Sequence, residues 1–278
     1  MNQQKIDPSR PSIATSRRNF AAGATVLMGA LLVPLLRPTR ANADHNHPSG
    51  RACDGPGQGD GRGHCICFLR GTRLNTPNGE IAIENLRVGD LVTTASGASR
   101  PVKWLAKMRH EREVSEHWQH GLRPIRIRAR ALDPQTPTRD LFVSGAHLMY
   151  FDDVLIAASD LVNGTSIIRE DAESCTVLEY FHVELETHDI LIAEGAAAES
   201  LQATSISRLQ FDNYDEFVRL YGDDAPDLCS CAPVVGYYGG RGEVASRWRS
   251  LIAPVIDIRE PLEIARDRID NLALRRAA

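Results

Sequence analysis

Residues 67–90 read CFLRGTRLNTPNGEIAIENLRVGD, a stretch in which short apolar runs alternate with turn signals. Pro77-Asn78-Gly79 is typical of a tight turn, because proline presets one backbone angle and Asn and Gly accept left-handed conformations. Further short β-rich runs follow at residues 100–105, 124–129, 140–143 and 154–157. Their lengths and spacing predict an all-β domain.

The pattern becomes helical at residue 212. Apolar side chains at positions 214, 217, 218 and 221 share one helical face and predict a helix over residues 213–221. Two further helices are expected at about residues 243–252 and 261–276, the last of them amphipathic and packed on the domain. No useful helical periodicity precedes residue 212. The sequence therefore predicts a β domain over residues 67–211 and a helical tail over residues 212–278.

A faint internal repeat runs through the β domain. Residues 86–90 (LRVGD) and 161–165 (LVNGT) each close a β unit with the same Leu-to-Gly spacing. This repeat favours a fold built from two similar halves.

Three blocks of sequence stand out. The first is the motif C-F-x-x-G-T-x-L-x-T-x-x-G at residues 67–79 with E-x-L-x-x-G-D at 84–90, the second is Ser144-Gly145-Ala146-His147, and the third spans residues 180–185 and 188–195. In this order they resemble the opening block, the Thr/Ser-x-x-His and the closing block of the Hedgehog/intein (Hint) domain. The resemblance covers about half of the chain and is stronger to the bacterial Hedgehog/intein-like subgroup than to true inteins. It implies an all-β, horseshoe-like Hint fold with a short α-helical C-terminal appendage.

The resemblance also implies a self-directed reaction at the peptide bond between Ile66 and Cys67. The Cys67 thiol would attack the Ile66 carbonyl and convert the amide into a thioester, an N–S acyl shift that acts on the chain's own N-terminal segment. His147 is the candidate proton donor to the departing nitrogen. Ser144 is the candidate hydrogen-bond donor to the scissile peptide or its oxyanion.

The fate of the thioester follows from what the closing block lacks. No terminal His-Asn pair follows Gly195, so full splicing is not expected. Hydrolysis, or transfer to a small nucleophile, fits better, and His182, His188 and Asp189 are candidates for activating that nucleophile. No cofactor is expected, and the reaction would be single-turnover autoprocessing rather than repeated catalysis. A thiol hydrolase that acts on other molecules is a rival interpretation.

The N-terminus resembles an export signal. Arg17 and Arg18 precede a weakly apolar run at residues 21–36, and Ala41 and Ala43 suit a signal-peptidase cleavage site. The run is interrupted by Pro and Gly and is shorter than the roughly 20 residues that span a bilayer. Residues 1–43 are therefore predicted to be a twin-arginine signal peptide without a stable membrane span, which implies a periplasmic or secreted protein.

Residues 44–66 form a Gly-rich segment that cannot support a core and is predicted to be flexible. Its Cys and His side chains leave three interpretations open: a plain tether, a disulfide or a metal site. The third interpretation, a metal site, leads to a second candidate function for the chain. In that case it is an exported metal- or ligand-binding protein with an inert Hint-like domain. The side chains in question are those of His45, His47, Cys53, His64 and Cys65.

The remaining cysteines and the charge balance add two expectations. Cys175 is predicted to lie in the core. For the pair Cys229 and Cys231, a metal site and a strained disulfide both stay open, and the lack of further ligands makes the case for metal weak. The chain has a net charge of −4, although residues 1–43 carry six basic groups and one acid. The rest of the chain is thus clearly acidic, and no nucleic-acid partner is expected.

Overall fold

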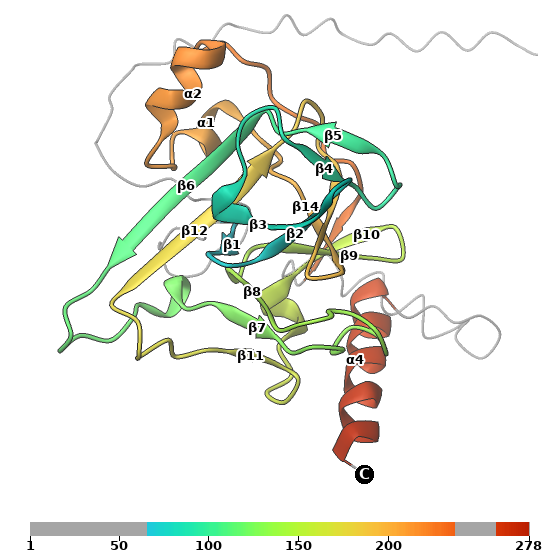
Figure 1. Ribbon diagram of the computed structural model, residues 1–278. Coiled ribbons are helices and arrows are strands. Elements are labelled where there is room, and N and C mark those ends of the chain that lie inside the picture. The colour runs from blue at the N-terminus through green and yellow to red at the C-terminus, as the bar shows by residue number, and fades with distance from the viewer. Residues whose placement is uncertain (1–65, 237–259, 278) are drawn as a thin grey trace, which may run out of the picture. The chain divides into compact units, whose positions relative to one another are not determined.

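The computed structural model describes residues 66–236 and 260–277. The expected leader at 1–43, nearly all of the segment 44–66 and the helix expected at 243–252 lie outside these residues. The described residues are mostly β-sheet with a short C-terminal helix, in agreement with the fold class expected from the sequence (Figure 1).

The first sheet has six strands in the order β11-β7-β8-β1-β12-β6, and all its neighbouring strands run antiparallel. Its members are β1 (Phe68–Leu69), β6 (Trp104–Glu111), β7 (Ile125–Ile127), β8 (Leu141–Val143), β11 (Ile167–Arg169) and β12 (Val177–Glu184).

The second sheet has seven strands in the order β15-β10-β9-β14-β13-β2-β3. β15 pairs with β10 in parallel and is a strand that the sequence pattern did not predict. The members are β2 (Arg73–Thr76), β3 (Gly79–Ala82), β9 (Leu148–Phe151), β10 (Val154–Ala157), β13 (Ile190–Ala193), β14 (Ala196–Glu199) and β15 (Val234–Val235). A separate hairpin joins β4 (Leu91–Thr93) to β5 (Ser99–Pro101).

Two similar units occur in the second sheet. The hairpin β2–β3 leads into the 3-10 helix η1 (Ile83–Asn85), and the hairpin β9–β10 leads into η3 (Ala158–Leu161). Each 3-10 helix begins with a backbone hydrogen bond to the residue before its hairpin, from Ile83 N–H to Thr72 O at 2.8 Å and from Ala158 N–H to His147 O at 2.9 Å. This correspondence is the arrangement that the internal repeat favours. A further 3-10 turn is η2 (His120–Leu122).

Two short helices pack beside one end of the β6–β12 pair (Figure 1). A single helical turn, α1 (Ser205–Arg208), precedes residue 212; it is too short to show a periodicity and is held by a capping box at Thr204. The helix α2 (Tyr214–Tyr221) confirms the prediction over residues 213–221. The ring of Phe217 packs edge-on against Trp104 at a centroid distance of 5.1 Å, which fixes α2 on the sheet.

The C-terminal helix α4 (Pro261–Ala277) agrees closely with the prediction over 261–276. It buries Leu262, Ala265 and Ile269 against the main apolar core, and Arg266 Nε donates to Asp160 O at 2.7 Å. Packing on the domain is thus confirmed for this helix. Within residues 66–236 and 260–277, no helix has both the length and the apolar character that a bilayer crossing requires.

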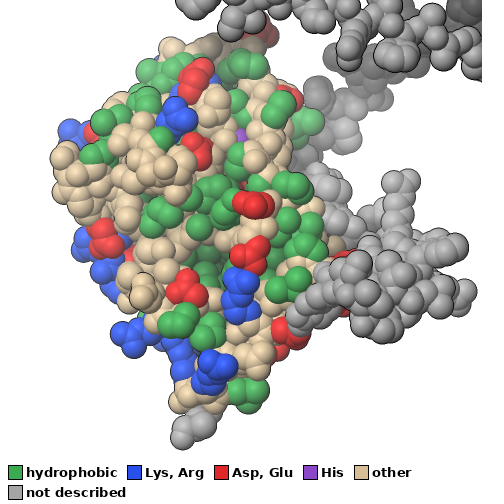
Figure 2. All heavy atoms as spheres, turned by 90° about the vertical axis from the view of Figure 1, so that its right-hand side faces the viewer, with side chains coloured by type: hydrophobic (Ala, Val, Ile, Leu, Met, Phe, Trp, Pro, Cys, Tyr) green, Lys and Arg blue, Asp and Glu red, His purple; other side chains and the backbone are tan. Residues whose placement is uncertain are grey.

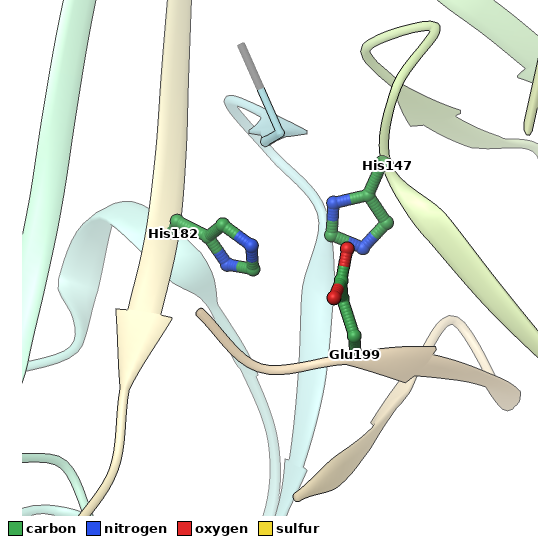
Figure 3. A group of neighbouring side chains, drawn as sticks. All are labelled: His147, His182 and Glu199. Carbon is green, nitrogen blue, oxygen red and sulfur yellow. The ribbon is translucent and has the colours of Figure 1, made fainter. Parts of the chain in front are cut away.

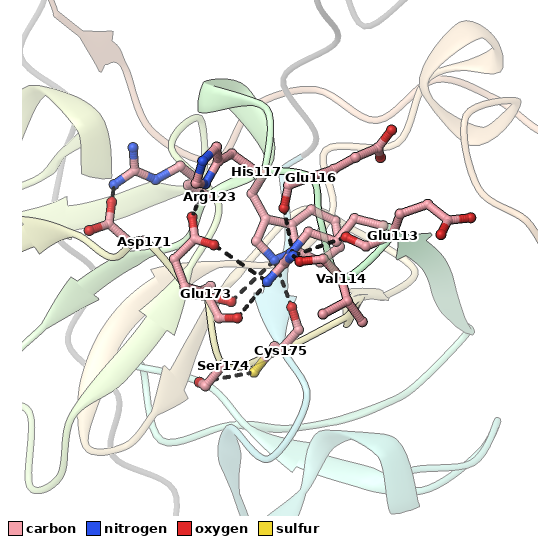
Figure 4. A network of polar contacts seen from close by, with 12 residues as sticks. Glu113, Val114, Glu116, His117, Arg123, Asp171, Glu173, Ser174 and Cys175 are labelled. Carbon is pink, nitrogen blue, oxygen red and sulfur yellow. Dashed lines mark hydrogen bonds and ion pairs between the residues drawn. The ribbon is translucent and has the colours of Figure 1, made fainter.

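A polar network ties together the two loops that flank β6 and β12 (Figure 4). Arg112 Nη1 donates to the carbonyl oxygen of Glu116 at 2.6 Å, and His117 Nδ1 lies 3.0 Å from Glu173 Oε1. Cys175 belongs to this network and is exposed, so the prediction that it lies in the core was wrong. Its carbonyl oxygen accepts from Trp118 Nε1 at 3.0 Å, and the turn holds its side chain at the surface.

On the face seen in Figure 2, acidic and basic side chains are interspersed.

Candidate active site

Cys67 lies immediately before β1 and is completely buried. Its backbone N–H donates to Ser144 Oγ at 2.8 Å, and its carbonyl oxygen accepts from Ser144 N–H at 2.8 Å. In this contact the Ser144 oxygen accepts from the N–H of the scissile amide, while donation by its hydroxyl to the oxyanion stays a prediction. The nitrogen of the Ile66–Cys67 bond is therefore held by a residue 77 positions away in the sequence.

The loop from Ser144 to His147 joins β8 of the first sheet to β9 of the second. A backbone bond from His147 N–H to Ser144 O at 3.2 Å closes the loop, and Ser159 N–H donates to Gly145 O at 2.9 Å. A Cβ at Gly145 would lie 3.2 Å from Arg169 Nη2, so a larger residue would crowd this point. The S-G-A-H sequence thus forms a compact turn that presents two buried side chains.

His147 is fully buried, and neither ring nitrogen has a hydrogen-bond partner among the residues that the structure describes. Its ring centroid lies 4.1 Å from that of Phe68, the residue that follows Cys67. Burial, and secondarily the charge of His188, lowers the pKa of His147 to about 3. The neutral imidazole is therefore the resting form near pH 7, and His147 becomes a proton donor only after it has first accepted a proton.

His182 lies in β12 opposite Ala106, whose small side chain leaves room for a ring. It is fully buried, its centroid is 5.1 Å from that of His147, and its Nδ1 accepts from Val183 N–H at 3.1 Å. Burial, with smaller contributions from His147 and His188, holds the pKa of His182 well below its usual range. His182 is thus a neutral neighbour of His147.

Glu199, at the end of β14, completes the group and was missed by the sequence interpretation. Its carboxylate is fully buried, Oε1 accepts from Leu148 N–H at 3.0 Å, and Oε2 lies 3.2 Å from His188 Nε2. Burial raises the pKa of Glu199, while His188 and the Leu148 N–H act against that rise. The sequence pattern that could have identified Glu199 is a single acidic residue directly after the run Ala196-Ala197-Ala198. A charged residue in a buried strand is costly unless it is paired or has a functional role.

Figure 3 shows how the two rings and the carboxylate converge. One candidate donor atom each from His147, His182 and Glu199 lies within 4.8 Å of the other two. The three residues come from a loop and two strands that belong to both sheets, so that the group forms where the chain passes between the sheets. These are the described residues that could hold a metal ion.

The two remaining candidates of the closing block have different surroundings. His188 joins the group through Glu199, and its Nδ1 accepts from Cys231 N–H at 3.0 Å. Asp189 instead accepts from its own strand at Ile190 N–H at 2.8 Å and lies 3.5 Å from Arg100 Nε. The contacts of Asp189 are those of a residue that anchors β13, and its role in activating a nucleophile stays a prediction.

Comparisons with known proteins assign the chain to a family. The family model for the Hint domain matches residues 66–205. Solved structures similar to this chain include the MchDnaB-1 intein (14% identity, TM-score 0.35, covering 48% of this chain and 99% of that one). Others are the gp41-1 intein (17%, 0.34, covering 48% and 96%) and a bacterial intein-like domain from Clostridium thermocellum (18%, 0.34, covering 49% and 98%). The comparison with curated proteins gives no match. Because the family model spans half of the sequence, this chain belongs to the Hint domain family.

Proposed function

We propose that the chain cleaves itself between Ile66 and Cys67 through an N–S acyl shift. The observation that carries this proposal is the hydrogen bond from Cys67 N–H to Ser144 Oγ at 2.8 Å, which fixes the nitrogen that must leave. The same loop places the unpartnered ring of His147 against Phe68, one residue beyond the nucleophile. Membership of the Hint family supports autoprocessing in general.

The first step moves one proton and exchanges one bond. His147 accepts the proton of the Cys67 thiol, and Sγ attacks the Ile66 carbonyl carbon to give a tetrahedral oxyanion. The bond from that carbon to Cys67 N then breaks as the nitrogen receives the proton back from His147. The products are a thioester between Ile66 and Cys67 Sγ and a free amine on Cys67, with no net change in protons.

Ser144 is in place to relay the returning proton, because its hydroxyl oxygen lies 2.8 Å from the leaving nitrogen. We expect Ser144→Ala to slow thioester formation by about a hundredfold, the order of magnitude for losing one well-placed hydrogen-bonding group. Ser144→Thr keeps the hydroxyl and is the matched control, with most of the rate retained. Equal rates for the alanine variant and the wild type, in rapid-quench measurements of fragment formation, would assign Ser144 to structure alone.

The thioester is then resolved by hydrolysis or by transfer to a small nucleophile. His188 Nε2 and Glu199 Oε2, 3.2 Å apart and buried, supply a base and an acid beside His147 for this second step. His188 belongs to the closing block, and Glu199 follows the end of that block by four residues.

The direct test is the intact mass of the purified full-length chain, with and without dithiothreitol or hydroxylamine. Both nucleophiles split a thioester and leave an amide intact. The expected products are an N-terminal fragment that ends at Ile66, as the thiol ester or hydroxamate, and a fragment that begins with Cys67. One unchanged intact mass under every nucleophile would rule the proposal out.

We also propose export through the twin-arginine route, on the basis of Arg17, Arg18 and the Ala41-Asn42-Ala43 site. Replacing Arg17 and Arg18 together by Lys keeps the charge and is expected to leave the precursor in the cytoplasm, as followed by cell fractionation. Replacing Arg37 and Arg40 by Lys is the matched control and leaves export intact. Wild-type periplasmic yield from the Arg17/Arg18 variant would refute this signal.

A further inference from the structure

We propose that the positive charge of Arg169 stabilises the oxyanion that forms on the Ile66 carbonyl carbon during the acyl shift. Arg169 ends β11, the edge strand of the first sheet. Its side chain lies against the turn that holds Cys67, and no sequence motif indicates that contact. This role rests on the proposed function, because it concerns the first step of that reaction.

The guanidinium of Arg169 packs against the turn that carries Ser144 and His147. A Cβ at Gly145 would lie 3.2 Å from Arg169 Nη2 and 3.3 Å from Nη1, so the cation approaches the backbone closely because Gly145 has no side chain. Gly145 directly follows Ser144, whose Oγ accepts from the Cys67 N–H at 2.8 Å. With consecutive Cα atoms about 3.8 Å apart, these contacts place the charge on the order of 10 Å from the scissile bond.

Arg169 is half-buried and has no carboxylate partner in the part of the chain that the structure describes. Its Nη1 donates to two carbonyl oxygens at the end of η2, to Arg123 O at 3.2 Å and to His120 O at 3.3 Å. The next residue in the chain, Glu170, pairs with Arg126 Nη1 at 2.9 Å. A guanidinium keeps its proton in a protein, so the charge beside the turn is permanent.

Burial makes this charge costly to hold. Burial lowers the pKa of Arg169, the charge of nearby Arg123 lowers it further, and Tyr180 acts in the opposite direction. Arg123 is itself paired with Asp171, so its own charge is compensated (Figure 4). A charge taken out of water without a partner costs free energy, and a neutral amide could donate to the same carbonyl oxygens without that cost. The two hydrogen bonds therefore do not explain why this residue is a cation.

The acyl shift creates a negative charge that Arg169 can offset. Attack of the Cys67 thiol converts the Ile66 carbonyl oxygen into an oxyanion. At an effective dielectric constant of about 20, two unit charges about 10 Å apart interact strongly enough to change a rate by about tenfold. The charge of Arg169 is not among the causes that lower the pKa of His147, so it does not oppose the transfer of the thiol proton to that ring.

A purely structural role for Arg169 predicts a different pattern of variants. If Arg169 only holds η2, a glutamine that donates to the carbonyl oxygens should replace it as well as a lysine does. If the charge matters, lysine should replace arginine and glutamine should not. The two substitutions therefore separate the charge of the side chain from its hydrogen bonds.

The test compares Arg169→Gln with Arg169→Lys in the full-length chain. Fragment formation is followed by rapid quench and intact mass under excess hydroxylamine, so that thioester formation limits the rate. Arg169→Gln is expected to be about tenfold slower than the wild type, and Arg169→Lys to stay within about threefold of it. Arg123→Gln is the matched control and should also stay within about threefold, because its charge is already paired with Asp171. Equal losses in Arg169→Gln and Arg169→Lys would assign Arg169 to holding η2 and overturn the proposal.

A second pair of variants leaves Arg169 in place. Ser159 Cβ lies 3.7 Å from the position of a Gly145 Cβ, the same point that the guanidinium approaches, so the carboxylate that Ser159→Asp introduces lies near Arg169. Ser159→Asp is expected to compensate the charge and to slow the shift by about tenfold. Ser159→Asn is equal in size and uncharged, and it should keep the wild-type rate. This pair decides the question even if the melting temperature of Arg169→Gln shows that it does not fold, and equal rates for the two Ser159 variants would overturn the proposal.

The outcomes distinguish this role from the proposed function. A wild-type chain that never forms the two fragments would refute the acyl shift and the role of Arg169 together. Wild-type cleavage that Cys67→Ala abolishes, with unchanged rates in Arg169→Gln and Ser159→Asp, would refute the role of Arg169 alone.

Discussion

Cys67→Ala is expected to abolish cleavage between Ile66 and Cys67 completely, in water and with every added nucleophile. Cys67 is the buried residue whose amide nitrogen is held by Ser144, and alanine has no atom that can take up the acyl chain. Because Cys67 is already small and enclosed, the substitution removes a single sulfur and should preserve the fold. Intact mass after a long incubation with hydroxylamine measures the outcome.

Two companion variants make the result specific to this thiol. Cys65→Ala removes a thiol two positions away and should cleave like the wild type. Cys67→Ser should keep a slow N–O shift but lose most of the rate, because an alcohol is far less ionised than a thiol at neutral pH. Equal cleavage in the wild type and in Cys67→Ala would trace the fragments to a contaminating protease.

His147→Ala is expected to slow formation of the thioester by about a hundred- to ten-thousandfold, the range for loss of a general acid–base group. The ring lies beside Phe68 and is free of hydrogen bonds to the described residues, so its loss breaks no hydrogen bond that those residues make with it. Rates of fragment formation under excess hydroxylamine, with EDTA present, provide the comparison. His117→Gln is the surface control, and a rate within threefold of wild type for His147→Ala would remove His147 from the mechanism.

The lowered pKa adds a dependence on pH to the same experiment. An ordinary histidine becomes protonated below its usual pKa of about 6.5 and can then no longer accept the thiol proton. Burial lowers the pKa of His147 to about 3, so this residue stays neutral from pH 8 down to pH 5. The wild-type rate should therefore show no decline centred near pH 6.5 while the chain remains folded. A decline in rate centred near pH 6.5 would mean that the group that accepts the thiol proton is exposed to solvent.

The sequence by itself determined the features that depend on neighbouring residues. The turn at Pro77-Asn78-Gly79 and the short β-rich runs give a mostly β fold, and the apolar spacing near residue 217 gives α2. The positions of Cys67 and of the Ser144-Gly145-Ala146-His147 turn follow from a local motif in the same way. Each of these features is written into a few consecutive residues, because backbone preferences and side-chain periodicity act over that distance.

Only the tertiary structure decided how distant residues meet. Glu199 enters the group through the contact with Leu148, 51 positions away, and no local pattern encodes that distance. The low pKa of His147 likewise arises from burial by both sheets, while Asp189, adjacent to His188 in the sequence, contacts Arg100 instead. Burial and charge depend on everything that packs around a side chain, so they are fixed only when the two sheets and their connections have come together.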